Sequence, residues 1–278
     1  MNKNKKTLIK VSVAFGLLPF LILPSLLFIN NKPKSLNLIR PHGFDVYDNQ
    51  NNDKEAKTRK LLDILIETVF SDDKIRQQEF IKKQEENKNQ LLLQVKDLSI
   101  KYLKSKSDND LKNLKDFYSE NWLFMLQNLN KFELHFLEYW KLESKKGKEL
   151  HSNSFLESIK KKEKPKNNYV FLDNYLEKIH PGSENEDLKS LSVVYLKKDK
   201  FIIRAIIDNN KRKLDIDKFI LFYESSVNRI IINTISNAIH LGVYHNQPDG
   251  YSSFEKDIVG VNGYPWNGML LLKEFKDV

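Results

Sequence analysis

The longest apolar stretch of the chain lies near its start. Fourteen of the 19 residues from Val11 to Ile29 are apolar, and four lysines precede them with no acidic residue. As a helix these residues would extend about 28 Å, close to the hydrocarbon thickness of a bilayer. We therefore predict a transmembrane helix within residues 1–30 that anchors the protein in the membrane.

A cleaved signal peptide is the alternative for this segment. Cleavage needs small residues in an Ala-x-Ala-like pattern, and the nearest approximation, at Ser25, has Leu26 and Leu27 beside it, so we favour a retained anchor. Four lysines and the amino terminus precede the apolar stretch, whereas three basic residues lie between residues 30 and 40. Under the positive-inside tendency, this bias predicts a single-pass protein of the cell membrane, with a cytoplasmic N-terminus and an extracellular C-terminal domain.

Polar residues with Pro33, Pro41, Gly43 and an Asn-rich run follow the apolar stretch and predict a flexible tether over residues 31–52. The remaining chain, residues 53–278, is predicted to be one soluble α+β domain. Its first part, residues 53–163, has the apolar periodicity of helices, and its second part, residues 167–278, is rich in short β-type runs. A lysine-rich connector around Pro165 separates the two parts.

Three helices account for the pattern in the first part. One apolar stripe runs from Leu61 to Phe70, and Ser71-Asp72-Asp73 would cap the next helix, a long charged segment from Lys74 to Lys106. Asp108 would cap the third helix. Along it, aromatic and aliphatic residues follow one another at spacings of three or four, namely Leu111, Leu114, Tyr118, Trp122, Met125, Leu129, Phe132, Phe136 and Tyr139. This spacing predicts one long central helix in which Trp122, Phe132 and Phe136 belong to the core.

Two short turns between apolar runs predict an antiparallel meander in the second part. The expected strands are Val193 to Leu196, Phe201 to Ile207 and Lys218 to Tyr223, and Met269 to Leu272 is expected to form a further short strand. The run from Val227 to Leu241 has apolar residues at every fourth position but poor helix formers between them, so both a helix and a strand remain open for it.

Turn residues and aromatics alternate in the last forty residues and predict loops suited to binding. Tyr251, Tyr264 and Trp266 are the candidate partner-binding residues there. Trp266 lies between Pro265 and Asn267-Gly268, so we expect its ring to be partly exposed in a turn and to contact a protein partner on the exported side.

The net charge of +9 raises the question of a polyanionic partner. The chain has 40 Lys but 6 Arg, together with 28 Asn. Because nucleic-acid sites lean on Arg for bidentate contacts, we expect a solvated lysine surface and no nucleic-acid partner. The chain has no Cys, which excludes disulfides, thiolate metal sites and a lipid-modified cysteine.

No complete catalytic, metal or cofactor motif is present in the sequence, and we expect no enzymatic activity, metal or cofactor. His240 and His245 are five residues apart, which places them on different faces of an α-helix, without the intervening Glu of a zinc protease. Asp215 and Asp217 could form a carboxylate pair on a strand, but neighbouring lysines favour a surface hairpin.

A cell-surface hydrolase is the alternative function. Its site would gather polar and aromatic residues of the C-terminal loops, namely Asp249, His245, Tyr251 and Tyr264.

The aromatic block from Phe117 through Trp122 and Phe124 to Tyr139-Trp140, behind a single N-terminal anchor, resembles the mycoplasma aromatic-motif membrane proteins. The Lys- and Asn-rich, cysteine-free composition agrees with this resemblance. It implies a surface-anchored accessory protein, of a family associated with gene neighbourhoods that encode an immunoglobulin-capturing and immunoglobulin-cleaving system and an F1-like ATPase. This chain would then act with one of these two systems. The resemblance carries no catalytic residue over to this chain.

Overall fold

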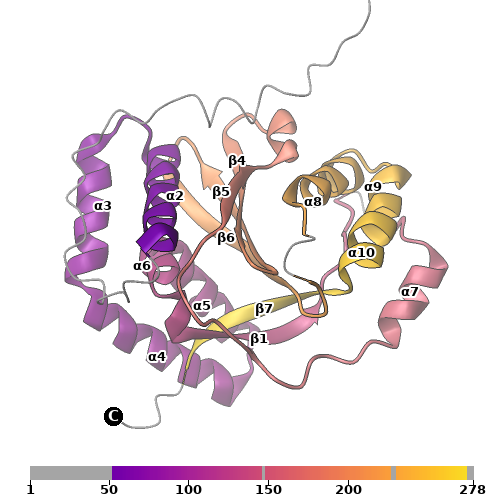
Figure 1. Cartoon of the computed structure of the whole chain (residues 1–278), viewed down its shortest axis with the longest axis horizontal. Helices are drawn as coiled ribbons and strands as arrows, with labels where there is room; N and C mark the ends of the chain where they lie inside the picture. Colours follow the sequence, from indigo (N-terminus) through magenta and orange to yellow (C-terminus); the bar gives the residue numbers. More distant parts are fainter. Residues whose placement is uncertain (1–51, 146–147, 227–229, 274–278) are drawn as a thin grey trace, which may run out of the picture. The chain divides into compact units, whose positions relative to one another are not determined.

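Seven strands form one antiparallel sheet at the centre of the computed structural model, which describes residues 52–145, 148–226 and 230–273 (Figure 1). The strand order is β2-β1-β7-β6-β5-β4-β3. The strands are β1 (Phe132–Tyr139), β2 (Tyr169–Val170), β3 (Lys178–Pro181), β4 (Leu191–Lys198), β5 (Phe201–Asp208), β6 (Lys213–Phe222) and β7 (Pro265–Leu272). The predicted anchor, residues 1–30, and all of the predicted tether except Asn52 lie outside the described residues.

Helices cover both faces of this sheet (Figure 1). The N-terminal helices on one face are α2 (Asn52–Phe70), α3 (Lys74–Glu86), α4 (Lys88–Ser105), α5 (Asp108–Glu120) and α6 (Trp122–Gln127), followed by the 3-10 turn η2 (Leu129–Lys131). The other face carries α7 (Asn153–Lys160), η3 (Ser183–Asp187), α8 (Ile232–Ile239), η4 (His240–Tyr244), α9 (Pro248–Ser253), η5 (Phe254–Val259) and α10 (Gly260–Asn262). None of the helices within the described ranges has the length and apolar character needed to cross a bilayer.

Alternation along the strands divides the interior into two cores. On β4, Val194 and Leu196 belong to the core beneath α2–α6, whereas Val193 and Tyr195 belong to the core beneath α8–α10. Successive side chains of a strand point to opposite faces, so a sheet that is covered on both sides needs apolar residues at consecutive positions. The predicted meander of β4, β5 and β6 is therefore confirmed, and it forms the middle of a three-layer α+β domain.

The prediction of one long aromatic helix is wrong, because the last α-helix of this segment ends at Gln127. The helix stops first at Asn121 and again at Asn128, where the side-chain amide of each donates to the carbonyl four residues earlier. From Phe132 onward the burial alternates with a period of two residues, which is the repeat of a strand. Phe132 and Phe136 are buried as predicted, but on β1, and the predicted helical part, residues 53–163, thus contains a strand of the sheet.

The other helix predictions are confirmed with shifted ends. Asp73 caps α3 by accepting from the backbone N–H of Arg76 at 3.1 Å. The charged segment is two helices that meet at Asn87, and Ser107 rather than Asp108 caps α5. For the run from Val227 to Leu241, both a helix and a strand were open, and the structure shows the helix α8 over Ile232–Ile239. Residues 227–229 of this run lie outside the described ranges.

The prediction of C-terminal loops is wrong for residues 248–262, which form the short helical segments α9, η5 and α10. Pro248 occupies the first turn of α9, where its missing N–H costs no hydrogen bond. Gly250 lies so close to η4 that an added Cβ would be 2.2 Å from the backbone nitrogen of Gly242. The glycines that indicated turns in the sequence serve here to bring two helical segments into backbone contact.

Helix side chains replace a missing strand partner where β6 and β7 separate. The β6–β7 ladder ends at the pair of Phe219 and Gly268. Beyond it, the Leu270 carbonyl accepts from the Tyr118 hydroxyl at 2.7 Å, and the Leu272 N–H donates to Ser99 Oγ at 3.1 Å. These bonds satisfy buried backbone groups that no strand reaches, and they fix the helical layer to the sheet.

Candidate functional site

Aromatic rings gather in two groups. In the core beneath the N-terminal helices, the Tyr118 ring makes edge contacts with Phe117, Phe132 and Phe219 at centroid distances of 5.6 to 5.8 Å. Trp122 stacks on Phe80 at 5.1 Å. The second group surrounds Tyr139 and contains Phe155, Tyr264 and Trp266, with centroid distances of 5.6 to 6.1 Å from Tyr139. The aromatic block of the sequence thus contributes to the interior of the domain.

The prediction of an exposed Trp266 is wrong. Its side chain is only 5% exposed, because Pro265 begins β7 and Trp266 pairs with Tyr139 of β1 and Leu221 of β6. The turn residues Asn267 and Gly268 lie inside the strand, and Gly268 allows the Leu134 side chain to approach where a Cβ would meet it at 2.7 Å. Exposure was the reason for assigning Trp266 to partner binding, and that reason no longer holds.

Tyr251 also lies in the interior. It belongs to α9, is 1% exposed, and its ring is 4.8 Å from that of His151. His151 in turn stacks on Phe155 and contacts Glu255 through Nδ1 at 2.9 Å. Tyr251 therefore offers a partner almost no accessible ring.

Of the three candidate partner-binding residues, Tyr264 is half-buried, whereas Tyr251 and Trp266 are buried. Its hydroxyl donates to Ser158 Oγ at 3.0 Å, and Lys162 Nζ lies 4.2 Å from the ring centroid. Lys162 also pairs with the half-exposed Glu224 at 3.6 Å, and Val261, three residues before Tyr264 in the chain, is 52% exposed. We call Lys162, Glu224, Val261 and Tyr264 the Tyr264 patch.

A fully buried carboxylate stands at the centre of a polar network on the C-terminal side of the sheet. Glu184 Oε1 accepts from the Tyr195 hydroxyl at 2.5 Å and from Arg204 Nη2 at 3.2 Å, and its Oε2 accepts from Ser236 at 2.8 Å. Arg204 Nη1 donates to Asp217 at 2.5 Å. Sequence patterns did not single out this network, because its members come from η3, β4, β5, β6 and α8.

Electrostatics explains how these charges are tolerated inside the protein. Burial disfavours the charged form of Arg204, but Tyr195, Asp217 and Glu184 outweigh it and raise the pKa of the guanidinium. Burial raises the pKa of Tyr195, so its hydroxyl remains a donor to Glu184. A cavity of about 250 Å³ opens beside Arg204. The bonds from Tyr195 of β4 and Arg204 of β5 to Glu184 join η3 to the sheet.

The predicted carboxylate pair on β6 is divided between two partners. The register of β5 and β6 shifts between Arg204 and Ala205, so that Asp217 bulges out of the ladder. Asp217 binds Arg204, whereas Asp215 pairs with Lys213 at 2.6 Å at the surface. The neighbouring lysine in the sequence, Lys213, indicated the contact of Asp215. No sequence pattern indicated the bulge at Asp217.

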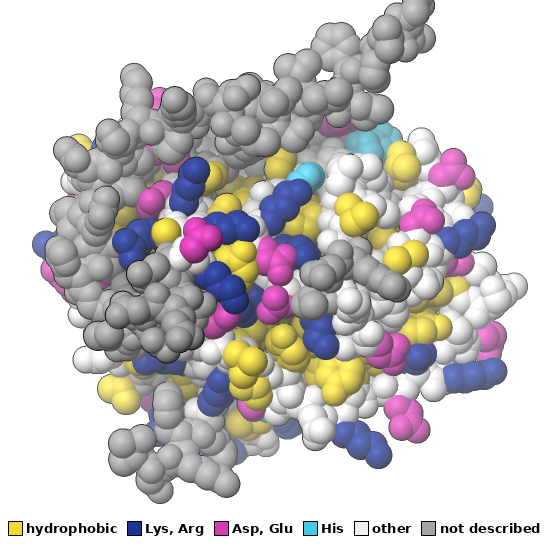
Figure 2. All heavy atoms as spheres, viewed as in Figure 1, with side chains coloured by type: hydrophobic (Ala, Val, Ile, Leu, Met, Phe, Trp, Pro, Cys, Tyr) yellow, Lys and Arg dark blue, Asp and Glu magenta, His cyan; other side chains and the backbone are white. Residues whose placement is uncertain are grey.

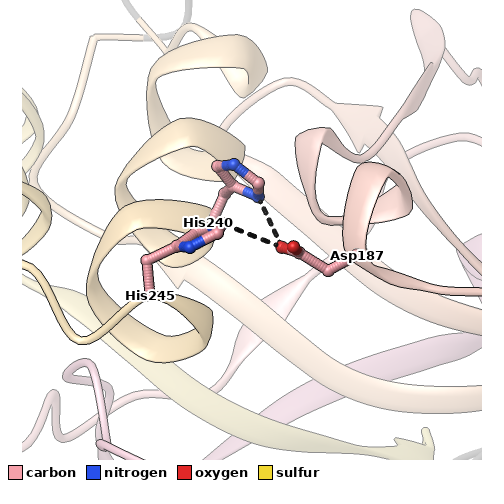
Figure 3. A group of neighbouring side chains, drawn as sticks. All are labelled: Asp187, His240 and His245. Carbon is pink, nitrogen blue, oxygen red and sulfur yellow. Dashed lines mark ion pairs between the residues drawn. The ribbon is translucent and has the colours of Figure 1, made fainter.

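His240 and His245 lie together, contrary to the prediction that they occupy different faces of a helix. The chain turns as a π-helix over η4, and the His245 N–H donates to the His240 carbonyl at 3.1 Å. A π-helix pairs residues five apart, so the two rings meet with centroids 4.5 Å apart. Asp187 of η3 lies between them, with Oδ2 3.1 Å from His240 Nδ1 and 3.2 Å from His245 Nε2 (Figure 3). We call these residues the Asp187 cluster.

The four residues of the alternative hydrolase site make separate contacts. His245 contacts Asp187, Tyr251 is enclosed beside His151, and Tyr264 lies against Tyr139 and Lys162. Asp249 is in the first turn of α9. These contacts give no support to a shared hydrolytic site.

Charge is mixed on the face of the molecule in Figure 2. Lys and Arg side chains lie among Asp and Glu side chains there, with small apolar areas between them. Many of the basic residues are engaged locally, as in the pairs Lys112–Asp116 and Lys160–Glu157. Such a surface is typical of solvated lysines.

One comparison with known proteins identifies a family for the chain. The family model described as aromatic cluster surface protein matches residues 37–264, more than four fifths of the sequence. No curated protein and no solved structure matches the chain. The match includes the aromatic block from Phe117 to Trp140 and strands β1 to β6, and it ends just before β7. The aromatic groups described above agree with the family's description. The chain belongs to the family of aromatic cluster surface proteins.

Proposed function

We propose that this protein is a membrane-anchored, non-enzymatic accessory subunit that holds a protein partner at the cell surface. The observation that carries the proposal is the match of residues 37–264 to a family of surface proteins. The apolar stretch from Val11 to Ile29, with its preceding lysines, supplies an anchor of suitable length. Together they support a domain that stands outside the cell on a single N-terminal span.

The orientation in this proposal rests on the flanking charges. Four lysines before the anchor favour a cytoplasmic N-terminus, with the tether and the α+β domain on the exported side. A tether of about 26 Å average reach would keep the domain, and any partner bound to it, near the membrane.

The Tyr264 patch is the proposed contact surface. It combines an exposed aliphatic side chain, a half-buried aromatic ring and a Lys–Glu pair, with Tyr264 held in place by Ser158. An aromatic ring that is fixed by its own domain can pack against a partner without a large loss of side-chain entropy. Of the three residues predicted from the sequence, Tyr264 is the one whose position supports that role.

The partner is proposed to belong to one of two surface systems. The resemblance of the aromatic block implies either an immunoglobulin-capturing and immunoglobulin-cleaving system or an F1-like ATPase complex. Both are assemblies of proteins, which agrees with a non-enzymatic accessory role for this chain.

Site-specific photo-crosslinking in intact cells tests the proposal. A photoreactive amino acid replaces Val261 of the Tyr264 patch in one strain and Leu93 of α4 in another. Leu93 is the matched control because it is also an exposed aliphatic residue, at 65% against 52% for Val261, and lies on a helix of the opposite layer. After illumination, the tagged chain is purified and its adducts are identified by mass spectrometry.

A defined protein adduct at position 261, absent at position 93, is the expected result. Adducts of equal yield at both positions would show that contacts are unspecific, and their absence at both would remove the Tyr264 patch as the contact surface. An adduct with a subunit of either named system decides between them.

A further inference from the structure

We propose that Asp187, His240 and His245 form a binding site for a divalent transition metal ion of the zinc type. The site combines two imidazole nitrogens with one carboxylate oxygen, a donor set that is frequent in zinc sites. Their ligand atoms all lie within 4.8 Å of one another, and this is the one such group of three found among the described residues.

The spacing of the donors suits one ion. Zinc binds imidazole nitrogen and carboxylate oxygen at about 2.0 to 2.2 Å, so donors around a tetrahedral ion lie roughly 3.3 to 3.6 Å apart. Asp187 Oδ2 is 3.1 Å from His240 Nδ1 and 3.2 Å from His245 Nε2. The three side chains point toward a common centre, from η3, from the first residue of η4 and from the residue that follows η4 (Figure 3). An ion would fit after shifts of a few tenths of an ångström at Asp187 and an approach of the two imidazole nitrogens, which lie within 4.8 Å of each other, by up to about 1.2 Å.

His240 provides an independent indication. Its Nδ1 is buried and makes no hydrogen bond, although Asp187 Oδ2 is only 3.1 Å away. The contact is short, but its direction is poor for an N–H donor. A buried nitrogen without a hydrogen bond normally costs free energy, and a metal ion bound to its lone pair would remove that cost.

The backbone around the cluster holds the ligands in place without the ion. Ser183, at the start of η3, donates from its N–H to Ser236 Oγ of α8 at 2.6 Å, and Ser236 in turn donates to Glu184. η4 continues directly from α8, and its π-turn sets the two histidines on one side. Short π-helical turns occur often at functional sites. The three ligands are therefore positioned by the same bonds that join η3, α8 and the sheet.

The donor chemistry selects the ion. Imidazole favours zinc and its first-row neighbours over magnesium and calcium, which prefer oxygen donors. The His240, Asp187 and His245 side chains are 15%, 30% and 40% exposed, so an ion can enter from solvent. Three protein ligands leave a fourth tetrahedral position for water or for a group from another molecule.

Histidine–carboxylate contacts elsewhere in the domain supply a matched control. His135 contacts Glu133 at 2.5 Å, without a second histidine. If a pair of this kind were enough for zinc binding, replacing His135 would matter as much as replacing His245. The proposal requires the second imidazole that the π-turn provides.

Zinc titration of the full-length chain tests the proposal. The protein carries an affinity tag without histidine, is purified in detergent and stripped with a chelator, and ZnCl₂ is then added in a calorimeter. We expect one zinc per chain. His245→Ala and Asp187→Asn should each weaken the affinity at least about tenfold, as expected for loss of a ligand, and His135→Ala should leave it within about twofold. Asp187→Asn keeps the shape of the side chain, and circular dichroism of each variant verifies folding.

The absorption of bound Co²⁺ gives a second readout, since its visible bands report nitrogen and oxygen ligands around the ion. No binding by the stripped chain would overturn the proposal. Binding that is equal in the wild type and in both cluster variants would also overturn it, because that result means an adventitious ion only.

Discussion

The hydroxyl of Tyr118 donates a hydrogen bond of 2.7 Å to the carbonyl of Leu270, 152 residues further along the chain. The bond reaches from α5 to β7 at the point where β6 and β7 have separated. Burial raises the pKa of Tyr118 well above its ordinary value, so the phenol remains a proton donor at any physiological pH. An aromatic residue of the block from Phe117 to Trp140 thus completes the backbone bonding of the sheet.

Removing that hydroxyl should destabilise the domain measurably. Tyr118→Phe keeps the ring contacts with Phe132 and Phe219 but leaves a buried carbonyl unsatisfied, which costs about 1 to 3 kcal/mol. Tyr223→Phe is the control, because the Tyr223 ring lies at the surface. A thermal melt of the full-length chain in detergent should show a lower midpoint for the first variant alone. Equal midpoints would mean that the bond to Leu270 contributes nothing.

Two of the three buried tryptophans, Trp122 and Trp266, should each be required for stability. Trp122 and Trp266 are 2% and 5% exposed in the same core, and truncation of such a side chain costs about 3 to 5 kcal/mol. Trp122→Ala and Trp266→Ala should therefore both melt early or fail to accumulate. Leu172→Ala, at an almost fully exposed position, should stay within about 0.5 kcal/mol of the wild type. A Trp266→Ala variant that melts with the wild type would restore the exposed position expected from the sequence.

Local patterns were sufficient to predict much of the fold. The helix stripes, the cap at Asp73 and the strands β4 and β5 follow from spacing and turn residues alone. The helical prediction for Phe132 to Tyr139 is wrong because aromatic residues four apart fit the repeat of a helix and the two-residue repeat of a strand equally well. Pairing with β7, more than 120 residues away, decides between them.

The contacts of the candidate sites had weaker signals in the sequence. The meeting of His240 and His245 depends on a π-turn, and the Arg204 contacts depend on a bulge at Asp217. Both irregularities change the side-chain period locally, so a pattern search that assumes regular helices and strands misplaces these residues. The buried Glu184 becomes noticeable only when η3 has been placed beside the sheet.

Loss of the buried guanidinium should be more damaging than loss of an exposed one. Arg204→Met leaves Glu184 and Asp217 without their cation, and removing one partner of a buried pair costs about 3 to 5 kcal/mol. The additional change Glu184→Leu should recover part of this loss, because it removes the unpaired buried carboxylate. Arg59→Met, which breaks the exposed pair with Glu55, should change the stability by less than about 1 kcal/mol. Urea unfolding of the three variants measures the difference, and an Arg204→Met midpoint equal to that of Arg59→Met would contradict the structural role.

Stability should fall as the pH decreases through the range of histidine titration. Burial lowers the pKa of His151 below its ordinary value of 6.5, despite the opposing bond to Glu255. The unfolded chain therefore takes up a proton at a higher pH than the folded chain does. The stabilising effect is complete above pH 6.5 and is lost as the pH falls from there through the folded pKa.

His151→Phe tests this assignment, because the ring stacked on Phe155 is kept while the ionisation is removed. Urea unfolding at pH 7.5 and pH 5.5 should show a smaller loss of stability for this variant than for the wild type. His135 and His180, whose pKa values are also lowered by burial, should account for a remaining dependence. An unchanged difference between the two pH values would remove His151 as a contributor.

Protease treatment of intact cells tests the proposed surface location most directly. Trypsin added outside the cells can reach the exposed lysines of the connector around Pro165, and an antibody against the domain then reports whether it is still intact. A cytoplasmic protein serves as the control for cell integrity, and lysed cells show that the domain can be digested. We predict that the domain is lost from intact cells while the cytoplasmic control survives. A domain that survives on intact cells and is digested only after lysis would contradict the surface location and the proposed orientation.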